Sequence, residues 1–410
     1  MLISICALLR AYHRWFMKRY DVIIIGGGAS GLFLASELGG KRVALLEAND
    51  RVGKKLLATG NGKCNLSNLD MNIIHYNHPS FVENYLDRFD AHDTIATFER
   101  MGLITKVIDK RVYPYSECAT TVLDVLRGAV AKAGTDVFVG HILNSVEYFA
   151  DTYTVSGIFK EDGQTKSFSL KADNVVLATG SNATFGRNSN NLFTALGHTN
   201  REYTPSLVPV KTNKEPIKGL SGVRVKAGVR CGARYEVGEV LFKDFGVSGI
   251  AVFNMSSEIA RGKLKIGSNL IIDFMPEYSQ GEVETMLRKR GNVRVGELLS
   301  GTFHSKVVDR ILWASGVDVN DLAQPKISTI AKTIKSYPVK VEGLGDSSLS
   351  QVMSGGLNIR EFDSNLMSMK SKNAFAIGEA LDVDGDCGGY NLQWAWTSAK
   401  IVADAIRKQY

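Results

Sequence analysis

The residues best suited to chemistry form a glycine-rich run near the N-terminus. The run 26–31, GGGASG, follows the apolar stretch 20–25, YDVIII, and precedes a helix-prone segment, 32–39. In such a run Gly26 permits a sharp turn, Gly28 lets a pyrophosphate approach the backbone, and Gly31 permits close packing of helix on strand. The helix N-terminus presents free N–H groups to the phosphates. The pattern predicts a dinucleotide-binding loop.

A carboxylate stands where such a loop needs one. Glu47 ends the second strand-like run, 42–47, RVALLE, and lies sixteen residues after Gly31. A carboxylate at this place accepts hydrogen bonds from the hydroxyls of an unphosphorylated ribose. The strand, loop, helix and second strand make a β-α-β unit of about thirty residues, as half of a Rossmann fold requires. These residues leave open whether the dinucleotide is FAD or NAD.

Three later segments also contain glycines and small polar residues that could line a ligand site. Residues 53–68, GKKLLATGNGKCNLSN, form a loop rich in small and basic residues, and 178–180, ATG, end a buried strand. Residues 378–394, GEALDVDGDCGGYNLQW, begin at the last residue of the apolar strand 373–378, NAFAIG, and open a C-terminal helix near Gly389. In open α/β sheets, ligands collect at the carboxyl ends of strands. A helix beginning near Gly389 would stabilise negative charge on a group bound there.

Composition sets broad limits. The chain has 410 residues, 44% of them hydrophobic and 22% charged, which is typical of globular proteins and favours two or three domains. The net charge of +7 comes from scattered Lys and Arg residues, so a basic enzyme is favoured over a nucleic-acid binder. Five widely spaced cysteines and no CxxC pair favour a reducing, cytoplasmic compartment and predict no metal site. Residues 1–17 are expected to be a disordered or mis-started extension, and whether residues 1–16 belong to the native protein stays open.

With these segments in view, the chain resembles the BaiN-like, aminoacetone-oxidase-like family of FAD-dependent oxidoreductases. The match rests on IIIGGGASGLFLA, GKKLLATGNGKCNLSN and GEALDVDGDCGGYNLQWAWTSA, with support from residues 238–253 and 354–362. The resemblance implies an α/β fold, with a Rossmann-like FAD-binding domain of glutathione-reductase type formed by 18–204 and 341–410. It also implies an inserted β-barrel-like domain, 205–280 with 313–340, and a small helical subdomain, 281–312. Independently of the resemblance, residues 205–340 are rich in Val and Gly and contain short strand-like runs, which predict a β-rich insert. A charged, helix-prone stretch within them predicts a helical part.

The resemblance also assigns FAD contacts along the whole chain. It implies that the first loop holds the pyrophosphate, that Glu47 binds the ribose, and that the last segment holds the ribityl chain and the pyrimidine end of the flavin. The residues assigned in this way are Gly26, Gly28, Ala29, Ser30, Gly31, Glu47, Arg51, Lys54, Leu56, Asn61, Gly62, Lys63, Cys64, Thr179, Gly180, Gly378, Glu379, Asp382, Gly389, Asn391 and Leu392.

The chain departs from the family pattern at positions that bear on the substrate. Lys63 stands where the family usually has Arg, so that a point charge replaces a forked guanidinium. Lys243-Asp244 and Ser248-Gly249-Ile250 also differ from the usual Thr-His and Ser-Gly-Pro. The substrate therefore cannot be carried over from the family.

The expected activity is two-electron transfer between FAD and a small organic substrate. Two directions remain open: oxidation of an amine or amino-ketone with dioxygen, and NAD(P)H-linked reduction of an ene. Because a flavin supplies the redox chemistry itself, no catalytic side chain is assigned. An RNA-modifying or nucleic-acid-binding flavoprotein is the alternative, although no aromatic–basic stripe is visible and neither nucleic acid nor membrane is expected as a partner.

Overall fold

In the computed structural model of the chain, residues 18–183 and 191–409 are described. The predicted N-terminal extension, 1–17, lies outside them. Contacts divide the chain into a first unit, Met1–Thr204 with Val352–Tyr410, and an inserted unit, Pro205–Gln351. No helix in the described ranges is both long and apolar enough to cross a membrane.

The first unit is built on one mixed sheet. Its parallel part has the order β6-β2-β1-β9-β18, and the long strand β9 continues into an antiparallel meander with β8 and β7. The strands are β1 (Arg19–Ile25), β2 (Val43–Leu46), β6 (Asp136–Phe138), β7 (Ile142–Phe149), β8 (Thr152–Glu161), β9 (Gln164–Leu177) and β18 (Ala374–Ala376). The Rossmann-type fold predicted from the glycine-rich run is confirmed.

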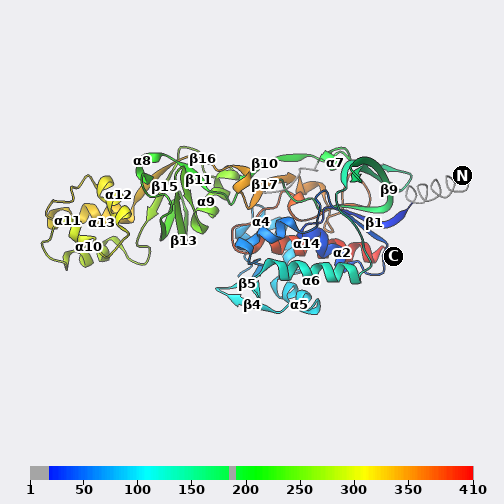
Figure 1. Ribbon diagram of the computed structural model, residues 1–410, viewed down its shortest axis with the longest axis horizontal. Helices are drawn as coiled ribbons and strands as arrows, with labels where there is room; N and C mark the ends of the chain where they lie inside the picture. Colours follow the sequence, from blue (N-terminus) through cyan, green and yellow to red (C-terminus); the bar gives the residue numbers. More distant parts are fainter. Residues whose placement is uncertain (1–17, 184–190, 410) are drawn as a thin grey trace, which may run out of the picture. The chain divides into compact units, whose positions relative to one another are not determined.

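Burial explains why these segments become parallel strands. The side chains of β2 are all buried, as are those of Ile23, Ile24 and Ile25 in β1, which is typical of strands covered on both faces. Helix α2 (Ala29–Glu37) packs against both α6 (Ala119–Lys132) and α14 (Tyr390–Lys408), so helices from the two ends and the middle of this unit lie together (Figure 1).

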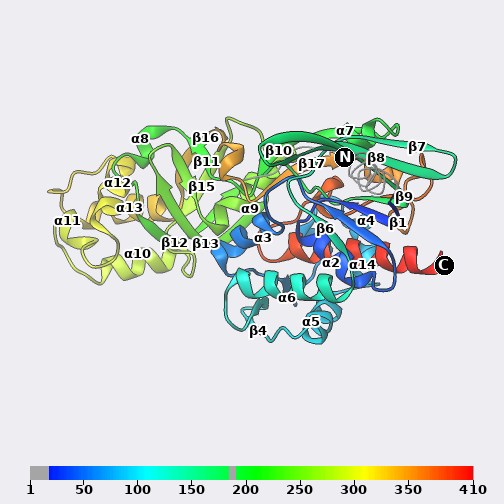
Figure 2. The same ribbon diagram turned by 45° about the vertical axis from the view of Figure 1, so that its right-hand side comes forward.

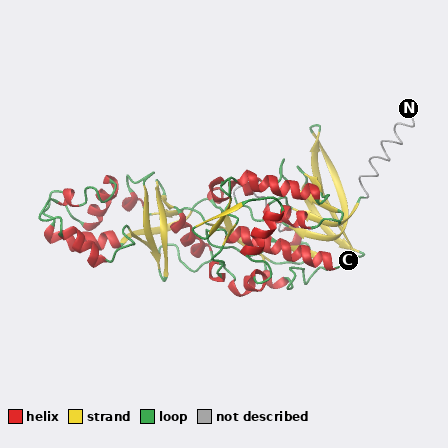
Figure 3. Cartoon of the chain, turned by 90° about the horizontal axis from the view of Figure 1, so that it is seen from below, coloured by secondary structure: helices red, strands yellow, loops and turns green. Residues whose placement is uncertain are grey.

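The inserted unit contains a closed six-stranded antiparallel barrel. The strand order is β11-β14-β13-β12-β15-β16, and α9 (Ile250–Ala260) packs on β13 and β12 (Figure 2). The strands are β11 (Val210–Thr212), β12 (Arg224–Cys231), β13 (Arg234–Lys243), β14 (Gly246–Ser248), β15 (Asn269–Asp273) and β16 (Tyr337–Leu344). Figure 3 shows the helices between β15 and β16, namely α10 (Gln280–Arg288), α11 (Val295–Leu298), α12 (Ser305–Ser315) and α13 (Ile327–Lys335).

The bounds of this unit differ from those expected in two places. Helix α13 falls in the segment 313–340, which was expected to be β-rich, because its β-branched residues follow helical spacing: Ile327, Ile330 and Ile334 are all buried. Strand β16 runs on to Leu344 and pairs with β11, which keeps the residues after 340 in the barrel rather than in the FAD-binding domain.

Two smaller sheets complete the first unit. One contains β3 (Ser67–Asn68), β5 (Arg111–Pro114) and β4 (Thr105–Ile108), and the other pairs β10 (Asn200–Ser206) with β17 (Val352–Leu357). In β17 a Cβ on Gly355 would come within 2.4 Å of the Glu202 carbonyl oxygen. Glycine at this position therefore permits the close approach of the two strands.

Candidate functional site

The first glycine loop joins β1 to α2 at the carboxyl edge of the sheet. Gly26 has a φ of +114°, and a Cβ there would lie 2.4 Å from the Ala178 carbonyl oxygen. A Cβ on Gly31 would lie 1.9 Å from the Gly26 carbonyl oxygen, so both positions require glycine for packing. At Gly28 a Cβ would meet nothing within 4 Å. The space beside Gly28, at the start of α2, is thus open to a ligand.

Glu47 lies beside this loop. One of its carboxylate oxygens accepts a hydrogen bond from the Gly27 backbone N–H at 2.9 Å, and the other accepts from the backbone and side chain of Asn49, both at 2.7 Å. The residue is only 9% exposed. Since each carboxylate oxygen has two lone pairs, Glu47 can fix the loop and still accept from ribose hydroxyls.

Residues 51–64 approach the site through the short helix α3 (Lys54–Ala58) and the turn that follows it. Leu56 is buried in the core, Arg51 is exposed, and Lys54 forms an ion pair with Asp50. Asn61 and Gly62 both have positive φ, at 54° and 86°. The turn presents backbone groups rather than long side chains, as close approach to a ligand requires.

Lys63 and Cys64 end this turn, and neither is chemically activated. The Lys63 ammonium lies 2.7 Å from Glu117, which Lys106 also contacts at 2.7 Å. Hydrogen bonds from these two lysines lower the pKa of Glu117 to about 2. Burial raises the pKa of the Cys64 thiol to about 12, so Cys64 is a protonated packing residue at neutral pH rather than a nucleophile.

Lys55, the neighbour of the predicted Lys54, joins the segments of the site. Its ammonium lies 2.6 Å from Oε2 of Glu379 and 3.2 Å from Oγ of Ser181, and Ser181 donates to the same carboxylate oxygen at 2.7 Å. This network links α3, the loop after β9, and the turn η6 (Gly378–Ala380) that follows β18. The adjacent lysines and the predicted Glu379 were the available signal, but only the orientation of α3 selects Lys55.

The end of β9 carries an unsatisfied polar group. Oγ1 of Thr179 is buried and has no hydrogen-bond partner among the described residues. Gly180 follows with a φ of +63°, and its carbonyl oxygen accepts from the hydroxyl of Tyr203 at 3.4 Å. A buried hydroxyl without a partner costs free energy, so this atom fits a site that a polar ligand completes.

The last segment touches the first. A Cβ on Gly378, where φ is +60°, would come within 2.9 Å of Oγ of Ser30. A Cβ on Gly389, where φ is +100°, would lie 2.6 Å from the Ser67 carbonyl oxygen and 3.0 Å from Oδ1 of Asn65. This Asn65 oxygen is also buried without a partner in the described part of the chain. The predicted segments from both ends of the chain therefore meet.

Other predicted residues of this segment hold the loop itself. The side chain of Asn391 exchanges two hydrogen bonds of 2.8 Å with the backbone of Gly385. Asp382 accepts from Nδ2 of Asn77 at 3.1 Å, and Leu392 packs against the core. Ala29 is half-buried at the first turn of α2, where it leaves the helix N-terminus accessible.

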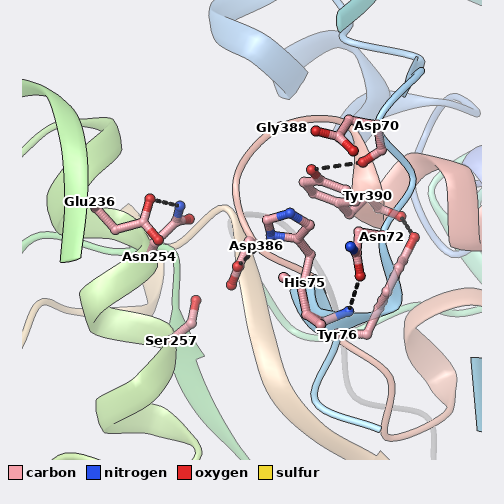
Figure 4. Close-up of polar contacts among 12 residues, drawn as sticks. Asp70, Asn72, His75, Tyr76, Glu236, Asn254, Ser257, Asp386, Gly388 and Tyr390 are labelled. Atoms are coloured by element: carbon pink, nitrogen blue, oxygen red, sulfur yellow. Dashed lines mark hydrogen bonds and ion pairs between the residues drawn. The ribbon is translucent and has the colours of Figure 1, made fainter. Parts of the chain in front are cut away.

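The close-up in Figure 4 shows a histidine–aspartate pair that sequence reasoning missed. Nδ1 of His75 lies 3.0 Å from Oδ2 of the fully buried Asp386, and the His75 ring stacks on Tyr390 with centroids 4.3 Å apart. The Tyr390 hydroxyl donates to the Asp70 carbonyl oxygen at 3.2 Å, and the hydroxyl of Tyr76 donates to the Tyr390 carbonyl oxygen at 2.8 Å. These contacts fix the last loop against residues 70–76.

The chain is similar to known proteins over nearly its whole length. The model of the HI0933-like protein Rossmann domain matches residues 20–405. A 3-dehydro-bile acid delta(4,6)-reductase of Clostridium scindens is 33% identical, over 94% of this chain and 98% of its own length. A ribosomal RNA dihydrouridine synthase of Haemophilus influenzae is 27% identical, over 96% of this chain and 100% of its own.

A solved structure supports the fold. The 3-ketosteroid-delta4-(5alpha)-dehydrogenase of Rhodococcus jostii superposes with a TM-score of 0.50 at 15% identity, over 95% of this chain and 97% of that one. The family match and the open glycine loop agree on FAD as the cofactor, and the predicted resemblance is confirmed. The chain belongs to the HI0933-like family of Rossmann-fold proteins and is an FAD-dependent oxidoreductase.

Proposed function

We propose that this enzyme reduces a carbon–carbon double bond conjugated to a carbonyl group in a small organic substrate, with NAD(P)H as the electron donor. The observation that carries the proposal is the full-length similarity to the bile acid reductase, together with the cofactor loops that meet in the first unit. Both relatives have names that describe reduction of such a double bond, in a steroid and in uracil. Reduction is therefore favoured over amine oxidation.

The contacts above support cofactor roles for the predicted residues. The loop at Gly28 receives the pyrophosphate at the N-terminus of α2, and Glu47 accepts from the ribose. Lys55 holds the Glu379 carboxylate in place on the flavin side, and the buried Thr179 hydroxyl forms a hydrogen bond to FAD. When bound, FAD supplies the hydride chemistry of the reaction.

Reduction of a double bond also needs a proton, and His75 is the proposed donor. Asp386, fully buried, accepts from Nδ1 and so fixes the tautomer and the orientation of the ring. His75 retains 27% side-chain exposure, which leaves its other edge accessible. In the doubly protonated form of His75, in which Asp386 holds the Nδ1–H, the proton passes from Nε2 to the carbon next to the carbonyl group and leaves the neutral ring with its proton on Nδ1.

Anaerobic single-turnover measurements test the proposal. The FAD-loaded enzyme, reduced by NAD(P)H, should be reoxidised by cyclic enones, with the yellow absorbance of oxidised flavin returning as the saturated ketone forms. Asp386→Asn should slow this step by about 10²-fold or more, the usual contribution of a positioned acid. Arg111→Gln, a change in the separate β3-β5-β4 sheet, should not slow it. Peroxide formation from amines in air, with no reoxidation by any enone, would refute the proposal.

A second candidate is reduction of a base in RNA, and charge distribution favours it. The inserted unit has 21 Lys and Arg residues against 15 Asp and Glu residues, so it carries +6 of the net charge of +7. Two aromatic rings in it are stacked by arginines: Trp313, 48% exposed, lies 5.4 Å from Arg310, and Tyr235 lies 5.0 Å from Arg230. Such pairs suit contact with unpaired bases.

The two candidates differ in a simple measurement. If RNA is the substrate, binding to ribosomal RNA fragments weakens steeply with salt, and Trp313→Ala weakens it further. If the substrate is a small enone, RNA binding is weak and does not depend on Trp313.

The proposal places the enzyme in the cytoplasm, which is supported by the lack of any disulfide among the described cysteines.

A further inference from the structure

The first unit contains a cavity whose lining includes one predicted FAD contact and several residues to which no role has been assigned. Its volume is about 400 Å³, within the range that holds small organic ligands. Four separate segments line it: the residue before α4 (Pro79–Leu86), the start of β10, the turn after β17 and the loop after η6. The lining residues include His78, Arg201, Asn358, Ile359, Arg360 and Asp382. Of the predicted FAD contacts, only Asp382 is among the lining residues.

The cavity wall carries excess positive charge. The lining residues include two arginines, Arg201 and Arg360, and one residue with a carboxylate, Asp382. Arg201 lies 3.5 Å from this carboxylate, whereas no carboxylate in the described ranges lies within ion-pair distance of Arg360. The neighbouring Glu361 is compensated, because Lys370 contacts it at 2.8 Å. The wall therefore has at least one positive charge that no carboxylate of the described residues neutralises.

Asp382 orients this wall rather than occupying the cavity as a free anion. Its carboxylate accepts from Asn77 at 3.1 Å and lies 3.5 Å from both Arg201 and His78. Although burial alone raises it, the pKa of Asp382 is lowered by the proximity of His78 and by the charge on Arg201, so the group stays ionised at neutral pH.

The remaining lining groups suit the rest of an organic molecule. Asn358 is fixed, because its side-chain amide donates to Thr199 at 3.2 Å and its Oδ1 accepts from the Arg360 backbone at 3.1 Å. Ile359 offers an apolar surface beside these polar groups. An apolar wall next to a fork of guanidinium groups matches a ligand with an organic body and one planar or tetrahedral oxyanion.

We propose that this cavity binds the oxyanion group, a carboxylate or a phosphate, of a small organic ligand, with Arg360 and Arg201 as its charge partners. The inference does not rest on the proposed reduction, because binding is measurable with oxidised FAD in place and no electron donor present.

Calorimetric titration of the FAD-loaded protein tests the proposal with benzoate, phenyl phosphate and the neutral analogue benzamide. The anions should bind and benzamide should not, and the tighter of the two anions identifies the source of the oxyanion. Arg360→Gln should weaken anion binding by about tenfold or more, since a hydrogen bond to a charged group is lost. Arg360 is exposed and its side chain forms no hydrogen bond or ion pair in the described part of the chain, so this variant should fold.

Arg111→Gln is the matched control, since it removes one guanidinium from the first unit outside the cavity, and it should bind the anions as the wild type does. Equal binding of benzamide and benzoate would overturn the proposal, as would wild-type affinity in Arg360→Gln. Arg201→Gln adds a second test, with the visible flavin spectrum reporting that the fold is intact. If neither anion binds while the enzyme still turns over enones normally, the proposed oxyanion site is wrong and the proposed reduction is unaffected.

Discussion

Gly28→Ala separates cofactor binding from folding more cleanly than other changes in the glycine loop. Gly28 has φ −80° and ψ −165°, which alanine adopts without strain, and a Cβ there meets no atom of the protein within 4 Å. The apoprotein should therefore be as stable as the wild type, or more stable by about 0.4–1 kcal/mol, because alanine reduces the entropy of the unfolded chain.

The same methyl group occupies the space proposed for the pyrophosphate. Displacing the phosphates from the backbone N–H groups loses one or two charge-assisted hydrogen bonds, together about 3 kcal/mol, or about 100-fold in Kd. At a concentration of FAD 100 times the wild-type Kd, the wild type gains about 2.7 kcal/mol of stability, whereas the variant gains only about 0.4 kcal/mol. The assay is urea unfolding of apoprotein with and without FAD.

Gly31→Ala is the informative contrast. Its Cβ would lie 1.9 Å from the backbone oxygen of Gly26, so it should destabilise the apoprotein itself by about 1–3 kcal/mol or more. If Gly28→Ala bound FAD with wild-type affinity, the pyrophosphate would not lie against this loop, and the reasoning would be refuted.

Three further results follow from the structure. Lys55→Met should lower the free energy of unfolding in urea by about 2 kcal/mol, because the Glu379 carboxylate loses its cationic partner. Adding Glu379→Gln should restore part of that loss, and an unchanged urea midpoint in Lys55→Met would contradict this expectation. Iodoacetamide should alkylate exposed Cys118, whose pKa is lowered by hydrogen bonds from Thr120, well before buried Cys64, and mass spectrometry of the native protein would show the order. Although burial acts to raise it, hydrogen bonds from Lys370 and Thr199 lower the pKa of Glu361 to about 2. Its stabilisation is complete above its ordinary pKa of 4.5 and is lost as the pH falls towards 2, so Glu361→Gln should unfold with a flatter dependence on pH in that window.

The sequence was informative where local spacing carries the structure. The strand 20–25, the glycines at 26 and 31, and Glu47 are close in sequence, and their packing follows from the β-α-β unit. The meeting of the two ends of the chain was predictable only through resemblance, because no local pattern specifies that Gly378 comes to rest beside Ser30.

Contacts set by distant segments could not be predicted. His75 and Asp386 are 311 residues apart, and only the folded loop brings them within 3.0 Å. The choice between Lys54 and Lys55 depends on how a helix of five residues is turned. Helix α13 was missed because its isoleucines, taken by residue type alone, favour a strand, while their spacing of three and four buries one helical face.

The packing of the last helix on the first one has a consequence for how the protein is made. The Phe33 ring of α2 lies against Trp396 of α14, with centroids 5.5 Å apart, and β18 adds to the sheet only through its pairing with β9. A chain without α14 would therefore leave the apolar surface of α2 exposed to water. Chaperones and proteases recognise such surface, so a variant truncated before α14 should be degraded faster than the chain that carries it.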